Sequence, residues 1–112
     1  MSAQSAIGRR RIDFAAVNRA AVMALPALCR RWLSDGKREG SEWVVGSLRG
    51  EPGRSLKVRL TGPNAGVWHD FAEGIGGSDP ISLAAALFGL SQSEAARRLA
   101  DMLGIEHARA RT

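Results

Sequence analysis

Basic side chains alternate with apolar ones along a short stretch near the middle of the chain, 56–60 (LKVRL). Alternation with a period of two is typical of a strand, and it places Lys57 and Arg59 together on one face. Arg49 and Arg54 precede them closely, and clustered cations of this kind can bind the phosphates of a nucleic acid. The pattern therefore predicts a phosphate-binding sheet face, with an ordinary solvated face as the alternative.

Aromatic residues lie on the next predicted strand, 67–71, and could stack on bases. On a period of two, Trp68 and Asp70 share one face, and His69 and Phe71 share the other. Single-strand binders stack bases on such rings, whereas aromatic residues of a small sheet are more often buried in its core. We take Trp68 and His69 as candidate nucleic-acid contacts.

Catalytic and metal-binding patterns are missing from the sequence. Cys29 is the one cysteine, so no cysteine cluster can hold zinc, and its apolar neighbours predict a buried thiol. The glycine-rich segment 74–77 lacks the Lys-Ser/Thr ending of a nucleotide-binding loop. No nucleophile–base pair stands out. We therefore expect no enzyme activity, no metal and no cofactor.

The composition favours a polyanionic partner in a reducing compartment. The 112 residues carry 16 Lys and Arg against 11 Asp and Glu, a formal net charge of +5. Most of these cations are arginines, whose planar guanidinium suits phosphate. The sequence shows no apolar run long enough to cross a bilayer and no signal-peptide core after its early arginines. We expect a cytoplasmic protein with no membrane partner.

The elements that would position these residues predict a single α+β domain over 12–105. A flexible basic arm, 1–11, precedes the domain and a tail, 106–112, follows it. The N-terminal part of the domain, 12–34, is helical, and the rest, 42–105, holds a small sheet and two further helices.

Capping and turn residues mark these elements. Asp13 can cap an N-terminal helix, which either kinks or restarts at Pro26. Asp79 and Ser91 can cap the two C-terminal helices. The strands between them are expected at 42–48, 56–60 and 67–71. They predict a small three-stranded antiparallel meander.

Several segments of the second half of the chain are similar, in order and spacing, to a known family. They are Gly46-Ser47-Leu48-Arg49, Arg54-Ser55-Leu56-Lys57-Val58, Asp70-Phe71-Ala72-Glu73, Gly74-Ile75-Gly76-Gly77 and Glu94–Ala100. Together they resemble the Cys-His-Cys-Cys zinc ribbon at the front of bacterial DNA primases. The resemblance implies a zinc-ribbon-like sheet without zinc, and a part in recognising single-stranded template.

The resemblance places the four ligand positions of the family at Gly46, Arg49, Asp70 and Glu73. Glycine and arginine do not bind zinc, and two carboxylates alone make a poor structural zinc site. We expect instead that Arg49 forks between Asp70 and Glu73 and holds the two hairpins together as the metal would. The alternative is that these three side chains are solvated and unconnected.

Two functions are compatible with these features. The first is a non-catalytic nucleic-acid-binding module, accessory to replication or priming of a chromosome or mobile element, with single-stranded DNA as ligand and a primase or helicase as a further partner. Its expected contacts are Arg49, Arg54, Lys57, Arg59, Trp68 and His69. The alternative is a protein–protein interaction module that docks through its alanine-rich N-terminal helix.

Overall fold

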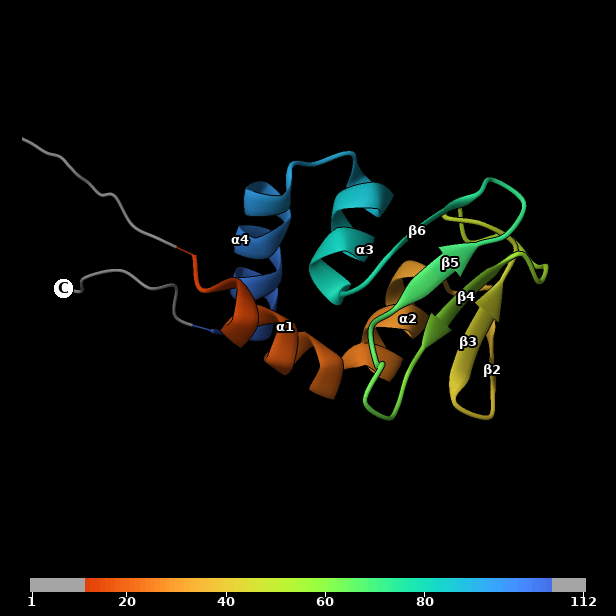
Figure 1. Cartoon of the computed structure of the whole chain (residues 1–112), viewed down its shortest axis with the longest axis horizontal. Coiled ribbons are helices and arrows are strands. Elements are labelled where there is room, and N and C mark those ends of the chain that lie inside the picture. The colour runs from red at the N-terminus through yellow and green to blue at the C-terminus, as the bar shows by residue number, and fades with distance from the viewer. Residues whose placement is uncertain (1–11, 106–112) are drawn as a thin grey trace, which may run out of the picture.

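The computed structural model describes residues 12–105, an α+β fold with a five-stranded antiparallel sheet at one end and helices at the other (Figure 1). In chain order the elements are α1 (Phe14–Met23), α2 (Leu25–Trp32), β2 (Lys37–Glu39), β3 (Glu42–Val45), β4 (Leu56–Arg59), β5 (Trp68–Asp70), β6 (Ile75–Gly77), α3 (Pro80–Phe88) and α4 (Gln92–Leu103). Every helix within residues 12–105 is too short or too polar to cross a bilayer. The arm expected at 1–11 and the tail expected at 106–112 lie outside the described residues.

The N-terminal segment is two helices rather than one continuous helix, so the chain restarts at Pro26, the second of the two expected alternatives. Asp13 caps α1 by accepting a hydrogen bond from the backbone N–H of Ala16, at 3.0 Å. Helix α1 ends at Met23, and α2 restarts at Leu25 with Pro26 in its first turn. Proline lacks the N–H that would continue the hydrogen bonds of α1, but its fixed φ suits the start of a new helix.

The sheet has five strands in the order β2-β3-β4-β5-β6, so the three-stranded sheet expected was wrong. The strands missed are its two edges, Lys-Arg-Glu in β2 and Ile-Gly-Gly in β6. Neither has alternating apolar residues, because an edge strand needs little burial and is held extended by hydrogen bonds to its neighbour. A row of register partners crosses the whole sheet: Lys37, Val44, Lys57, His69 and Gly76.

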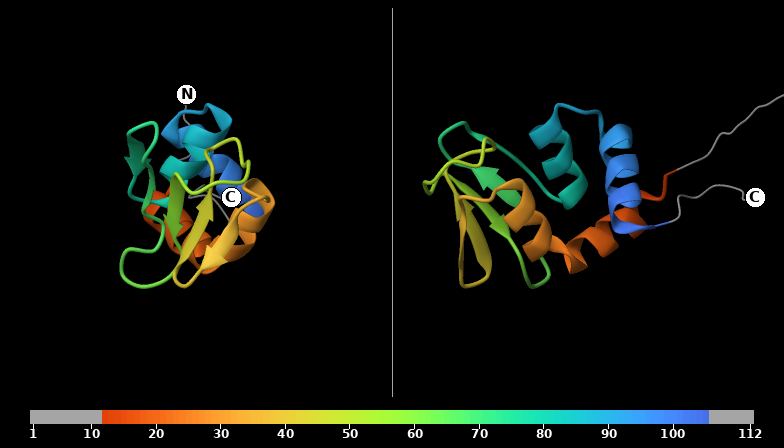
Figure 2. Two further views of the ribbon diagram at one scale, coloured as in Figure 1. Left: turned by 90° about the vertical axis from the view of Figure 1, so that its right-hand side faces the viewer. Right: turned by 180° about the vertical axis from the view of Figure 1, so that it is seen from behind.

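Helix α2 covers one face of the sheet, which we call the inner face. The buried side chains shared by these layers are Leu25, Cys29, Leu33, Trp43, Val45, Leu56, Val58, Leu60, Trp68 and Leu83. Figure 2 shows α2 close to the sheet and α4 at the far end of the molecule. Among the described elements, no helix packs on the opposite, outer face, which carries the register row given above.

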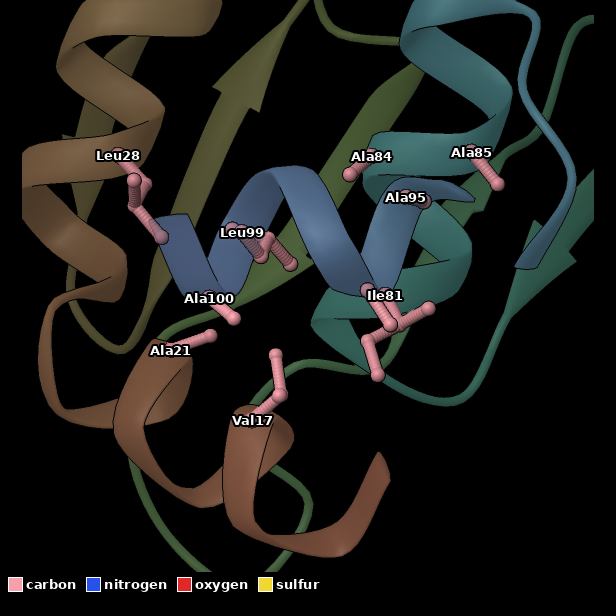
Figure 3. Close-up of a cluster of buried hydrophobic side chains, with 10 residues drawn as sticks. Val17, Ala21, Leu28, Ile81, Ala84, Ala85, Ala95, Leu99 and Ala100 are labelled. Atoms are coloured by element: carbon pink, nitrogen blue, oxygen red, sulfur yellow. The ribbon is translucent and has the colours of Figure 1, made fainter. Parts of the chain in front are cut away.

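A second core joins α1, α3 and α4, with Leu28 contributed by α2 (Figure 3). Its side chains are mostly alanine and medium-sized aliphatic residues: Val17, Ala21, Leu28, Ile81, Ala84, Ala85, Ala95, Ala96, Leu99 and Ala100. Small side chains allow the helix axes to approach closely. The buried alanine of α1, Ala21, packs in this core at 0% exposure.

Candidate nucleic-acid interface

Strand β4 presents its two cations on the outer face, as its alternation predicts. Val58, between them in the sequence, is fully buried on the inner face, whereas Lys57 is half-buried and Arg59 exposed. The register sets Lys57 opposite His69 of β5 and Arg59 opposite Glu42 of β3. The outer face of β3, β4 and β5 therefore brings together two cations, an imidazole and a carboxylate.

Phe71 adds an exposed aromatic ring to this face. Its backbone N–H donates to the carbonyl of Ser55 at 2.8 Å, which continues the β4–β5 pairing one residue beyond β5. Its side chain is 65% exposed, and its ring meets that of His69 edge to face, with centroids 4.4 Å apart and an interplanar angle of 64°. Exposed rings beside cations are the groups on which single-stranded nucleic acids stack.

These side chains surround a shallow hollow of about 150 Å³. The residues that line it are Glu42, Lys57, Arg59, Asn64, Val67, Trp68, His69 and Phe71. Asn64 reaches the hollow because the β4–β5 connection folds back tightly: the N–H of Gly66 donates to the carbonyl of Arg59 at 2.8 Å. Gly66 has φ +99°, a backbone conformation that favours glycine.

Trp68 cannot act as the stacking residue that the sequence suggested. Its side chain is 4% exposed, and its indole Nε1 donates to the hydroxyl of Ser82 at 2.9 Å. Strand alternation turns it to the inner face, so that it borders the hollow while its ring stays buried. The aromatic group available on the outer face is Phe71, which corrects the expectation for Trp68.

Arg54 is engaged within the protein. Its Nη1 and Nη2 donate to the two carboxylate oxygens of Glu39 at 2.6 and 2.9 Å, and these hydrogen bonds lower the pKa of Glu39. The bond draws the β3–β4 loop toward β2, where Pro52 and Arg54 border a hollow that also reaches Val44, 3% exposed. The loop thus occupies the β2–β3 side of the outer face, while the β4–β5 side stays open.

The expected clamp of Arg49 between Asp70 and Glu73 is not formed. Among the described residues Arg49 makes no ion pair with either carboxylate, and its side chain is exposed. Asp70 is buried at 1% exposure, and its Oδ1 accepts hydrogen bonds from the backbone N–H groups of Ala72 and Glu73 at 3.1 and 3.2 Å. One oxygen of this buried carboxylate thus accepts from its own turn, and among the described residues no arginine pairs with it.

The positions that the resemblance assigned to metal ligands lie at the same end of the sheet. The register row Val45, Leu56 and Asp70 places the loop after β3 and the turn after β5 at the same end of the sheet, with β4 between them. Gly46 begins that loop, and a Cβ there would lie 2.8 Å from the carbonyl oxygens of Glu51 and Pro52. Glycine at this position is explained by close backbone packing rather than by a lost metal ligand.

Metal ligation and thiol chemistry find no support in the described residues. No group of three or more His, Cys, Asp or Glu side chains within 12–105 could hold a metal ion. Cys29 is fully buried, and desolvation raises the pKa of its thiol to about 12. At neutral pH the thiol stays protonated and unreactive.

Of the predicted contacts, Lys57, Arg59, His69 and the buried Trp68 line the hollow, whereas Arg49 and Arg54 do not. Sequence reasoning missed Phe71, Asn64 and Glu42. Strand alternation already placed Phe71 on the same face as His69, and Lys57 and Arg59 together on a neighbouring strand. That signal could have identified Phe71 as a candidate contact. The positions of Asn64 and Glu42 depend on a turn and on a register that no local pattern encodes.

Comparison with protein-family models, with curated proteins and with solved structures finds no match to this chain.

Proposed function

We propose that this chain binds single-stranded nucleic acid, DNA in the first instance, through the open outer face of β3, β4 and β5. The observation that carries the proposal is the exposed ring of Phe71 against His69, on the same face as Lys57 and Arg59. The cations would bind phosphates and the rings would stack on bases, which is the usual division of labour in single-strand binding.

A single strand fits this face better than a duplex does. Stacking on Phe71 needs an unpaired base, because the flat surfaces of bases inside a duplex are already covered by their neighbours. The hollow beside Phe71 is small, about 150 Å³. Its side chains can contact one base but cannot follow the groove of a duplex. The overall charge of +5 adds a favourable long-range attraction to any polyanion.

The biological setting of the proposal comes from the motif resemblance. A module similar to the primase zinc ribbon, without metal and without catalysis, would act in the cytoplasm as an accessory to replication or priming of a chromosome or mobile element. A primase or helicase would be its protein partner.

The test is a titration of the full chain with labelled single-stranded and duplex DNA at about 50 mM and about 200 mM salt. The variant Lys57→Glu/Arg59→Glu reverses both outer-face cations. Its matched control, Arg97→Glu/Arg98→Glu, makes the same charge change on exposed positions of α4, at the far end of the molecule. We expect single-strand binding that weakens with salt, that the outer-face variant abolishes and that the α4 variant largely retains. Binding that survives in the outer-face variant would contradict the proposal.

A second candidate, protein docking, is favoured by a different feature. Met23 is 85% exposed at the end of α1, beside a largely apolar groove of about 520 Å³ between α1, the β4–β5 connection and the start of α3. Val22 and Pro63 also line it. Because Ala21 is buried inside the protein, docking would use this groove rather than the alanine side of the helix. Partner binding that withstands high salt and is lost in Met23→Glu would support this function.

A further inference from the structure

One carboxylate lies in the otherwise cationic hollow. Glu42 of β3 lines it opposite Arg59, and its side chain is half-buried. Among residues 12–105 it forms no hydrogen bond and no ion pair. Glu39, the nearby acid on the same face, is instead held by both guanidinium nitrogens of Arg54. Glu42 is therefore an uncommitted acceptor at the site where we place a base.

A carboxylate on a phosphate-binding surface repels the backbone of the ligand, so its presence calls for a compensating contact. When ionised it can only accept hydrogen bonds. The exocyclic amines of cytosine, adenine and guanine donate, whereas thymine presents the O4 acceptor where cytosine carries its N4 amine. A carboxylate at the edge of a stacked base therefore distinguishes the two pyrimidines, which have the same ring size.

We infer that the hollow takes one unpaired base stacked against Phe71, and that Glu42 selects a base with an exocyclic amine over thymine. Asn64 lines the same hollow with an amide that can both donate and accept, so it can orient any base without selecting one. This inference rests on the proposed function and adds the specificity of its site.

The experiment compares dC and dT oligonucleotides of about 12 nucleotides near pH 7.5. Matching the two pyrimidines removes most of the difference in stacking area. We expect the wild-type chain to bind the dC strand about fivefold to tenfold more tightly, the lower range for one base-edge contact. In Glu42→Gln the ratio should fall close to one, because an amide can donate to thymine O4 as well as accept from an amine.

The control is Glu73→Gln, which removes the same charge from an exposed side chain outside the hollow. Glu73→Gln should raise affinity for both strands slightly and leave their ratio unchanged, since it removes a repulsive charge outside the hollow, whereas Glu42→Gln should change the ratio. Thermal unfolding of all three proteins verifies that they are folded.

The other outcomes distinguish failure of base selection from failure of single-strand binding. Equal binding of dC and dT by the wild type, or a ratio that persists in Glu42→Gln, rejects base selection by Glu42 and leaves single-strand binding intact. Absence of binding to both strands rejects the proposed function and the inference together.

Discussion

The indole Nε1 of Trp68 donates to the hydroxyl of Ser82 over 2.9 Å, and this bond joins β5 to the first turn of α3. Ser82 also belongs to the cap of α3: its backbone N–H donates to Asp79 Oδ1 at 2.8 Å, and its hydroxyl donates to the Asp79 carbonyl at 2.7 Å. Because strand neighbours alternate, holding Trp68 inward also turns His69 outward. This contact therefore accompanies the packing of Trp68 in the inner core, and His69 faces the solvent.

Replacing Ser82 with alanine should lower the free energy of unfolding by about 1–3 kcal/mol, because it leaves the buried indole N–H without an acceptor and removes one half of the capping box. Urea denaturation measures the change. Ser78→Ala is the control, since Ser78 is exposed and its loss should change stability by less than about 0.5 kcal/mol. Equal stability of the two variants would show that the bond contributes nothing.

Gly77→Ala should also destabilise the fold, by about 1–3 kcal/mol, through crowding at the same contact. A Cβ at this position would lie 2.6 Å from Trp68 Nε1 and would overlap the Ser82 hydroxyl. Gly40→Ala is the comparison, because Gly40 has φ +62° and open space around it, so that only backbone strain applies there. A larger loss for Gly40→Ala, measured by the same denaturation, would contradict the crowding.

Phe71→Ala should weaken binding to single-stranded DNA about tenfold, since stacking of one base on an aromatic ring is worth roughly 1–3 kcal/mol. Its effect on unfolding should be below about 0.5 kcal/mol, because the side chain is 65% exposed. Phe88→Ala is the matched control: this ring is 49% exposed, lies on α3 and contacts Trp32 rather than the hollow. Equal losses of affinity in the two variants would argue against a stacking role for Phe71.

Asp70→Ala and Arg49→Ala separate the observed turn from the expected ion pair. Loss of Asp70 leaves the N–H groups of Ala72 and Glu73 without their acceptor and should cost about 1–2 kcal/mol in urea denaturation. Asp70→Asn keeps a side-chain oxygen and should cost less. Arg49→Ala should stay within about 0.5 kcal/mol, because the side chain is exposed. A destabilisation by Arg49→Ala as large as that of Asp70→Ala would support the ion pair of Arg49 with Asp70 and Glu73 instead.

The buried thiol of Cys29 predicts a pH dependence of stability. Burial raises its pKa to about 12, whereas a thiol in the unfolded chain titrates near about 8.5. Above that value the unfolded chain loses a proton that the folded chain keeps, so stability is intact below about pH 8.5 and declines as the pH rises toward 12. Between about pH 8 and pH 10 the wild type should lose about 1–2 kcal/mol more than Cys29→Ala. Parallel profiles for the two proteins would contradict the raised pKa.

Residue types and short-range spacing predict a substantial part of the fold. Asp13, Asp79 and Ser91 cap helices where expected, because a cap is made within four residues of chain. The alternation over 56–60 correctly assigned Leu56 and Val58 to the core and Arg59 to the solvent. These features depend on local geometry that neighbouring side chains set by themselves.

Long-range packing decided what the local patterns could not. The edge strands β2 and β6 form because β3 and β5 offer them hydrogen bonds. Arg54 forms an ion pair with Glu39 because the β3–β4 loop brings the two side chains together. Trp68 was withdrawn from the solvent by a helix that begins a dozen residues later in the chain. Composition and periodicity thus predicted a cationic sheet face. Contacts between residues distant in sequence decide which of its rings, cations and carboxylates remain available to a ligand. Forming such contacts loses the entropy of the intervening loops, and packing of the whole core offsets that loss.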